Sequence, residues 1–122
     1  MSGNARILVV EDDPANRDTL CALLAQMGYS PIAAHRGEDA LTVLDAGTDI
    51  DVIISDVVMP GISGLEFTRR ARERRPDVPI VFVTGDRDAM ESVLESGALA
   101  LLKPYSASTL EGVISEALAS GR

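Results

Sequence analysis

The sequence predicts an α/β protein built on a single doubly wound sheet of five parallel strands. Short apolar runs alternate with helical segments five times along the 122 residues, a pattern typical of βαβ units. Three of these runs, ILVV, VII and IVFV, are continuously apolar, as expected for strands that helices cover on both faces. No linker, repeat or low-complexity stretch interrupts the pattern. We therefore expect one domain over residues 1–122.

The expected strands are short, and turn or capping residues separate them from the helices. The strands are expected at Arg6–Glu11, Ser30–His35, Asp51–Asp56, Pro79–Thr84 and Leu99–Leu102. The first helix begins at Pro14, behind an Asp13 cap, and Gly28 ends it. The other helices are expected at Gly37–Asp45, at Gly64–Arg75, at Asp86–Ser96 and after a Ser106 cap.

Each helix carries apolar side chains at the three- and four-residue spacing that places them on one face. The inward-facing residues are expected to be Leu20, Leu23, Leu24 and Met27; Ala40, Leu41 and Leu44; Leu65, Thr68 and Ala71; Met90, Val93 and Leu94; and Leu110, Val113, Ile114, Ala117 and Leu118. The last set is the most regular stripe in the chain. These faces are expected to cover the sheet.

The charge balance argues against direct binding to nucleic acid. Acidic residues outnumber basic ones by 19 to 11, which gives a net charge of −8, whereas affinity for nucleic acid comes largely from Lys and Arg contacts to phosphate. One basic stretch stands out, at Arg69, Arg70, Arg72, Arg74 and Arg75. We interpret it as a solvated helix face, with a docking surface for an acidic partner as the alternative.

The sequence lacks the signals of membrane insertion and secretion. No run of about 18 apolar residues is present, and the first apolar stretch ends in three acids rather than in small residues. We therefore expect a cytoplasmic protein. Cys21 is the only cysteine and His35 the only histidine, which excludes a zinc site built from Cys and His and argues against a Cys–His nucleophile.

Polar residues follow four of the five strands. The first strand leads into Glu11-Asp12-Asp13, the third ends in Asp56, the fourth in Thr84-Gly85 and the fifth in Lys103-Pro104. Taken singly, each has a plain structural interpretation as a helix cap or a turn. Because ligands of doubly wound sheets bind at the carboxyl ends of the strands, their joint placement predicts a site.

The residue types at this edge indicate phosphoryl chemistry. Clustered carboxylates repel one another unless a cation lies among them, and an oxygen-only site suits Mg²⁺. A carboxylate can act as a nucleophile and form an acyl phosphate. Lys103 and Thr84 could then supply positive charge and a hydrogen-bond donor to the phosphoryl oxygens.

The segments ILVVEDD, SDVVMPGISG, FVTG and LLKP occur in this order, and together they closely resemble the receiver domain of two-component response regulators. The resemblance covers essentially the whole chain. It implies a flavodoxin-like (βα)5 fold with strand order 2-1-3-4-5. It also implies a signalling module that phosphorylates and dephosphorylates itself, rather than an enzyme that turns over a small substrate.

The resemblance assigns the metal ligands residue by residue. Asp56 matches the phosphoacceptor, which also contacts the metal, and Asp12 matches the acid that binds Mg²⁺ directly. Glu11 matches the acid that usually binds through water. Val58, two residues after the acceptor, would give its backbone carbonyl to the metal.

The resemblance also assigns the residues that contact the phosphoryl group and the partners. Thr84 matches the switch hydroxyl and Lys103 the lysine that pairs with phosphoryl oxygens. The phosphoryl group would come from a histidine kinase or a histidine phosphotransfer protein and would alter binding to an output partner that the sequence does not identify.

The sequence departs from the family at one position. The family usually has an aromatic residue three positions before the Lys-Pro lysine, where this chain has Ala100, or Leu101 in an alternative alignment. The stretch from Thr84 to Lys103 also looks about three residues short, as in a small subgroup of receivers without the aromatic switch. We therefore expect the signal to leave through residues 85–96, and Tyr105 to pack under the last helix.

Two other functions remain as alternatives. A pseudo-receiver would have the same fold and act as a binding module that never carries phosphate. A haloacid-dehalogenase-like phosphatase also uses an aspartyl phosphate and Mg²⁺, but it needs a DxD pair after its first strand, and Glu11-Asp12-Asp13 does not provide one.

Overall fold

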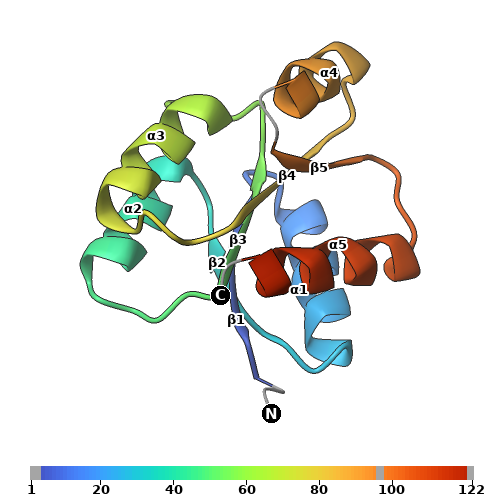
Figure 1. Ribbon diagram of the computed structural model, residues 1–122, viewed down its shortest axis with the longest axis horizontal. Coiled ribbons are helices and arrows are strands. Elements are labelled where there is room, and N and C mark those ends of the chain that lie inside the picture. Colours follow the sequence, from blue (N-terminus) through green and yellow to red (C-terminus); the bar gives the residue numbers. More distant parts are fainter. Residues whose placement is uncertain (1–3, 96–97, 121–122) are drawn as a thin grey trace.

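Five parallel strands form the central sheet in the order β2-β1-β3-β4-β5 (Figure 1). The computed structural model describes residues 4–95 and 98–120. The strands are β1 (Arg6–Val10), β2 (Ser30–Ala34), β3 (Val52–Asp56), β4 (Ile80–Thr84) and β5 (Leu99–Leu102). The expected strand order and the doubly wound architecture are confirmed, and each strand bound lies within one residue of its predicted position.

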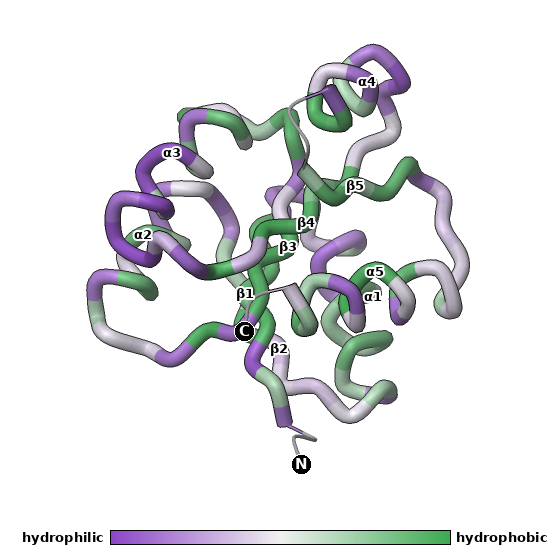
Figure 2. Tube along the Cα trace, in the orientation of Figure 1, coloured by the Kyte–Doolittle hydropathy of each residue, from purple (hydrophilic) through white to green (hydrophobic). Residues whose placement is uncertain are grey.

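Helices cover both faces of the sheet. They are α1 (Pro14–Gln26), α2 (Gly37–Asp45), α3 (Gly64–Arg74), α4 (Arg87–Glu95) and α5 (Ala107–Ser120). One buried apolar cluster joins residues of α2, α3 and α4 to one face of the sheet. A second cluster joins α1 and α5 to the other face. Figure 2 shows the corresponding pattern, with hydrophobic central strands and hydrophilic residues on the outer side of α3.

The helix boundaries follow the capping residues. The Asp13 carboxylate accepts a hydrogen bond from the Asn16 N–H at 2.9 Å and caps α1, and the Ser106 hydroxyl accepts one from the Thr109 N–H at 3.1 Å before α5. Gly28, which follows α1, has a positive φ of 94°, a conformation that glycine adopts without strain. Ser96, the expected last residue of α4, lies outside the described residues.

Two helices present different faces to the core than the sequence predicts. Leu65 and Leu94 were expected to face inward, and both are 51% exposed. In α3 the buried residues are Gly64, Phe67 and Ala71, so Leu65 is rotated about 100° away from the buried stripe. In α4 only Val93 is buried, and its neighbour Leu94 is rotated outward in the same way.

The remaining predicted faces agree with the structure. Leu20 and Leu24 of α1 and the triplet Ala40, Leu41 and Leu44 of α2 are buried, as are Leu110, Ile114 and Ala117 of α5. Cys21 is half-buried against the second cluster, and burial raises the pKa of its thiol. No helix in the described ranges is long and apolar enough to cross a membrane.

Candidate functional site

Three carboxylates meet at the carboxyl edge of the sheet. Asp56 is the last residue of β3, while Glu11 and Asp12 follow β1 directly, and these two strands are hydrogen-bonded neighbours. One carboxylate oxygen from each of the three residues lies within 4.8 Å of the others. Glu11 is 3% exposed and Asp56 is 9% exposed, so little water screens their mutual repulsion.

Lys103 supplies the positive charge of this cluster. Its Nζ lies 3.2 Å from Asp56 Oδ2 and 3.2 Å from Glu11 Oε1. Burial disfavours the charged ammonium, but the Asp56 and Glu11 carboxylates outweigh that effect and raise the pKa of Lys103 above its ordinary 10.5. The side chain is therefore a cation at neutral pH. Its flexible stem allows the ammonium to change its position relative to the Asp56 and Glu11 oxygens.

Backbone N–H groups hold the carboxylates in place. The Val58 N–H donates to Asp56 Oδ1 at 3.2 Å, and the Asp13 N–H donates to Glu11 Oε2 at 3.1 Å. Val58 itself is 64% exposed. These two bonds fix the orientation of the Asp56 and Glu11 carboxylates.

Thr84 ends β4, which pairs with β3, and is 2% exposed. Its Oγ1 accepts a hydrogen bond from the Asp86 N–H at 3.1 Å, and its carbonyl accepts one from the Lys103 N–H at 2.7 Å. Asp86 in turn accepts hydrogen bonds from the Asp88 and Ala89 N–H groups at 2.9 and 3.3 Å. The hydroxyl is therefore linked through Asp86 to the first turn of α4.

The position expected to lack the aromatic switch lies on β5. Ala100 pairs with Phe82 across the sheet and Leu101 pairs with Val83. Ala100 is partly buried and Leu101 is buried, and neither side chain has a ring. Tyr105 packs against the cluster that α5 forms with the sheet, as expected, and burial raises the pKa of its hydroxyl.

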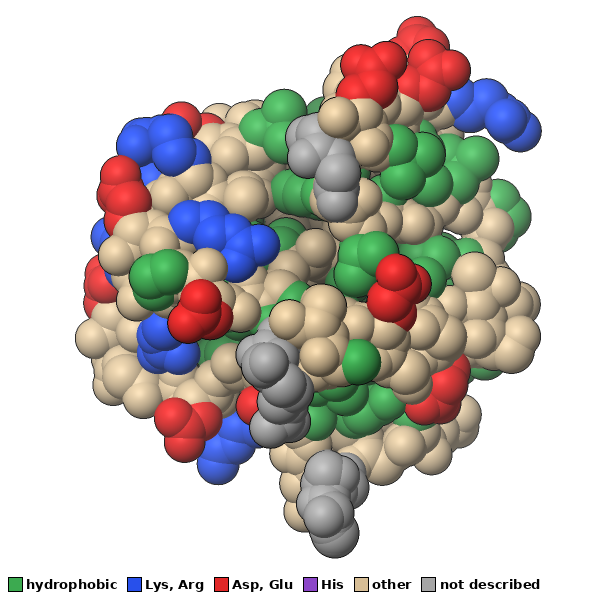
Figure 3. Space-filling view, in the orientation of Figure 1, with side chains coloured by type: hydrophobic (Ala, Val, Ile, Leu, Met, Phe, Trp, Pro, Cys, Tyr) green, Lys and Arg blue, Asp and Glu red, His purple; other side chains and the backbone are tan. Residues whose placement is uncertain are grey.

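The basic stretch on α3 is mostly neutralised within the chain. Arg69 and Arg70 both bind Glu66, and these two guanidinium groups lower the pKa of Glu66 to about 2. Arg74 binds Asp45, and Arg75 donates to backbone carbonyl groups. Figure 3 shows blue and red side chains interspersed on this side of the molecule, which agrees with a solvated helix face.

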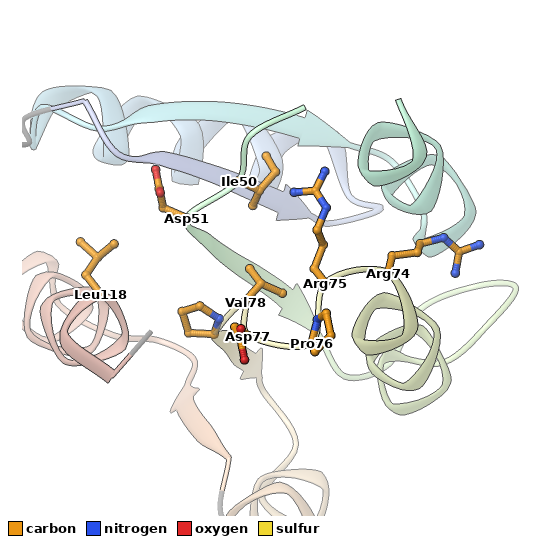
Figure 4. Close-up of a pocket in the computed structure, with 9 residues that line it drawn as sticks. Ile50, Asp51, Arg74, Arg75, Pro76, Asp77, Val78 and Leu118 are labelled. Atoms are coloured by element: carbon orange, nitrogen blue, oxygen red, sulfur yellow. The ribbon is translucent and has the colours of Figure 1, made fainter. Parts of the chain in front are cut away.

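A hollow of about 280 Å³ adjoins the carboxylates and is lined by Glu11, Lys103, Tyr105 and residues of α1. A second hollow, of about 330 Å³, lies at the opposite end of the sheet, beside Asp51, Arg74, Arg75 and Leu118 (Figure 4). The second holds none of the residues that the sequence singles out for chemistry. The first is therefore the hollow that belongs to the site.

Comparison with known proteins decides the family. Residues 7–115 match the family described as the response regulator receiver domain. This chain belongs to that family. The receiver domain resembles the sensor kinase CckA of Brucella abortus, with 35% identity over 122 residues that cover 97% of this chain and 13% of the kinase. It also resembles the response regulator MprA of Mycobacterium bovis, with 40% identity over 97 residues that cover 78% of this chain and 42% of that protein.

Solved structures agree with this assignment. The receiver domain from the hybrid histidine kinase CckA is 36% identical, with a TM-score of 0.80 over 93% of this chain and 99% of the other. The Thermotoga maritima response regulator TrrA, solved in complex with Mg²⁺-BeF, is 31% identical, with a TM-score of 0.84 over 93% of this chain and 99% of the other. The chain spans only 10–13% of the sensor kinases it matches. The chain is therefore a receiver domain, homologous to those of sensor kinases and response regulators.

The structure thus brings Glu11, Asp12, Asp56 and Lys103 into one cluster, and it places Thr84 at the end of the adjacent strand. Ser55, which no sequence pattern singles out, has a buried hydroxyl that donates to the Asp56 carbonyl at 2.9 Å. A serine within an apolar strand is a weak signal, because only the fold reveals which carbonyl it contacts.

Proposed function

We propose that this receiver domain takes a phosphoryl group onto Asp56 from the phosphohistidine of a histidine kinase or a histidine phosphotransfer protein. The observation that carries the proposal is the position of the Asp56 carboxylate, which lies within reach of two further carboxylates and 3.2 Å from the Lys103 ammonium. In the transfer, a carboxylate oxygen of Asp56 forms a bond to phosphorus while the bond from phosphorus to the histidine nitrogen breaks. The histidine leaves with the electron pair of that bond.

The residues at the edge fit Mg²⁺. Three carboxylates face one paired cation among the described residues, and a hard divalent ion with oxygen ligands would relieve the remaining negative charge. Asp12, Asp56 and the Val58 carbonyl would hold the ion directly. Glu11, whose two oxygens accept hydrogen bonds from Lys103 and the Asp13 N–H, would contact the ion through water. When bound, Mg²⁺ supplies positive charge beside the phosphoryl oxygens.

Lys103 and Thr84 are the two residues around Asp56 that would contact the phosphoryl group. Lys103 pairs with Asp56 before the transfer and, in this proposal, with a phosphoryl oxygen after it. The buried Thr84 hydroxyl is a donor on the neighbouring strand and would turn toward the phosphoryl group. Glu11, Asp56 and Thr84 are buried, and burial strengthens each of these interactions.

The signal is proposed to leave through α4. A Thr84 hydroxyl that turns toward the phosphoryl group no longer accepts from the Asp86 N–H in the same geometry, and Asp86 caps α4. Because neither Ala100 nor Leu101 carries a ring that could follow the hydroxyl, the change passes to the helix start. The output partner would read this helix in the cytoplasm, with no direct contact to nucleic acid.

Incubation with acetyl phosphate and Mg²⁺ tests the acceptor. Intact-mass measurement should show one added phosphoryl group on the wild type and none on Asp56→Asn. Asp13→Asn is the matched control, because asparagine also caps helices, and it should be labelled like the wild type. Equal labelling of Asp56→Asn would refute the assignment. An unlabelled wild type would favour the pseudo-receiver, and steady release of phosphate from a phosphate ester would favour the phosphatase.

A further inference from the structure

Gly64, the first residue of α3, lies directly against the backbone that carries Asp56. A Cβ atom added to Gly64 would lie 2.5 Å from the Asp56 carbonyl oxygen, 2.8 Å from Val57 Cα and 2.9 Å from the Val57 carbonyl oxygen. All three are backbone atoms, which cannot rotate away as a side chain can. A residue with a Cβ at this position must therefore displace the chain that follows the acceptor.

The same peptide groups are held from other sides. The Gly64 N–H donates to the Val57 carbonyl at 2.9 Å, and the buried Ser55 hydroxyl donates to the Asp56 carbonyl at 2.9 Å. The N–H of Val58, which belongs to the peptide group between Val57 and Val58, donates to the Asp56 carboxylate. The acceptor carboxylate and the Val58 backbone thus depend on one short stretch of main chain that Gly64 touches.

We propose that Gly64 is a positioning residue for phosphoryl transfer: its missing side chain lets the start of α3 fix the Asp56–Val58 backbone where the acceptor and the metal ligands need it. This inference rests on the proposed function of Asp56. Moving the added Cβ from 2.5 Å to an ordinary contact of 3.4 Å needs a shift of about 0.9 Å. A misplacement of about 1 Å can reduce the rate of a reaction on the order of 100-fold.

Gly37 offers a matched control. It is the first residue of α2 and is buried like Gly64, so replacement by alanine adds the same methyl group at the same position in a helix. A Cβ there would lie 2.8 and 2.9 Å from two atoms of the Ile62 side chain. That side chain can change rotamer, and the third near atom, Phe67 Cβ at 3.4 Å, belongs to α3 and not to the Asp56–Val58 backbone. Gly37→Ala therefore measures how much an added Cβ in the first turn of a buried helix affects rate and stability when it does not touch the Asp56–Val58 backbone.

The test compares Gly64→Ala and Gly37→Ala in the full chain. The rate of labelling by acetyl phosphate is measured over a range of Mg²⁺ concentrations, and thermal melting follows stability. We expect Gly64→Ala to lower the maximal rate about 10- to 100-fold and to require more Mg²⁺ for half-maximal rate. Gly37→Ala should stay within about threefold of the wild type in both, whatever its melting temperature. A folded Gly64→Ala variant that matches Gly37→Ala in rate and Mg²⁺ dependence would overturn the proposal.

Ser55→Ala covers the case in which Gly64→Ala does not fold. It frees the Asp56 carbonyl from one of its supports without adding an atom, and we expect a severalfold lower rate with a shifted Mg²⁺ dependence. An unchanged rate and Mg²⁺ dependence would then overturn the positioning role. Failure of the proposed function has a different signature, because then the wild type is unlabelled or Asp56→Asn is still labelled.

Discussion

The helices α3 and α4 lie on the same face of the sheet, and they are anchored very differently. Three residues of α3 are buried, including Phe67 at 0% exposure, and its first residue, Gly64, lies against the backbone at the end of β3. In α4 only Val93 is buried, and its acidic residues are exposed at the top of the view in Figure 3. Elements with few buried contacts open at low free-energy cost. The structure around α3 is therefore suited to fixing the position of Asp56, and α4 is suited to changing its conformation when Asp56 is phosphorylated.

Core truncation gives the largest expected difference between the two helices. Phe67→Ala should lower the free energy of unfolding by about 3–5 kcal/mol, since it leaves a cavity in the core. Val93→Ala removes two buried methyl groups at about 0.8 kcal/mol each and should cost about a third to a half as much. Urea denaturation of both variants measures the difference. Equal losses would show that α4 is anchored as firmly as α3.

Removal of a metal ligand should abolish the stabilisation by Mg²⁺. A ligand that binds only the folded state at 100 times its Kd stabilises it by about 2.7 kcal/mol, so Mg²⁺ should raise the melting temperature of the wild type. Asp12→Ala should show no such rise. Asp13→Asn should keep it, because Asp13 caps α1 and does not belong to the three-carboxylate cluster. If millimolar Mg²⁺ leaves the melting temperature of the wild type unchanged, the proposed Mg²⁺ site is wrong.

Lys103→Ala should separate phosphorylation from response. Lys103 is the only lysine in the chain, and its loss leaves the Asp56 and Glu11 carboxylates without their paired cation. We expect labelling by acetyl phosphate to continue at a reduced rate, while the phosphorylated variant no longer changes amide exchange in α4. A Lys103→Arg variant shows whether charge alone suffices. If phosphorylated Lys103→Ala shows the same changes of amide exchange in α4 as the wild type, Lys103 has no role in signalling.

The cap of α4 should give the smallest effect. Asp86→Ala removes the acceptor of the Asp88 and Ala89 N–H groups, and loss of an N-cap costs about 1 kcal/mol. Because α4 is weakly anchored, we expect faster amide exchange in residues 87–95 with little change in the strands. Asp86→Asn should retain the cap. Loss of protection across the whole sheet would mean that α4 does not open independently.

The sequence predicts the polar residues of the edge because the short apolar runs show where each strand ends. Asp56, Thr84 and Lys103 can thus be placed at one edge from the sequence. The apolar runs do not show which strands are neighbours, and the order 2-1-3-4-5 came from the family resemblance. The roles of Asp56, Thr84, Lys103 and the metal ligands remain predictions until they are tested.

Other features depend on tertiary contacts that no local pattern encodes. Leu94 follows directly after Val93, and in a helix with one narrow buried stripe only one of two adjacent apolar residues can face the core. In α3, Leu65 and Phe67 lie about 200° apart around the helix, so burial of Phe67 turns Leu65 outward. In the sequence, Gly64 marks only the expected start of a helix at the end of the SDVVMPGISG segment. The approach of α3 to the end of β3 shows why a side chain does not fit there.

The most direct test is amide hydrogen exchange with and without Mg²⁺ and beryllofluoride, which is a stand-in for the phosphoryl group. It shows whether a change at Asp56 alters the protection of α4 while α3 keeps its own. The Asp56→Asn variant is the control that should show no effect of beryllofluoride. We expect protection to change in residues 86–95 of the wild type, while residues 64–74 of α3 keep theirs. Unchanged protection in residues 86–95, with changes confined to the surroundings of Tyr105, would contradict the assignment of α4 as the responding element.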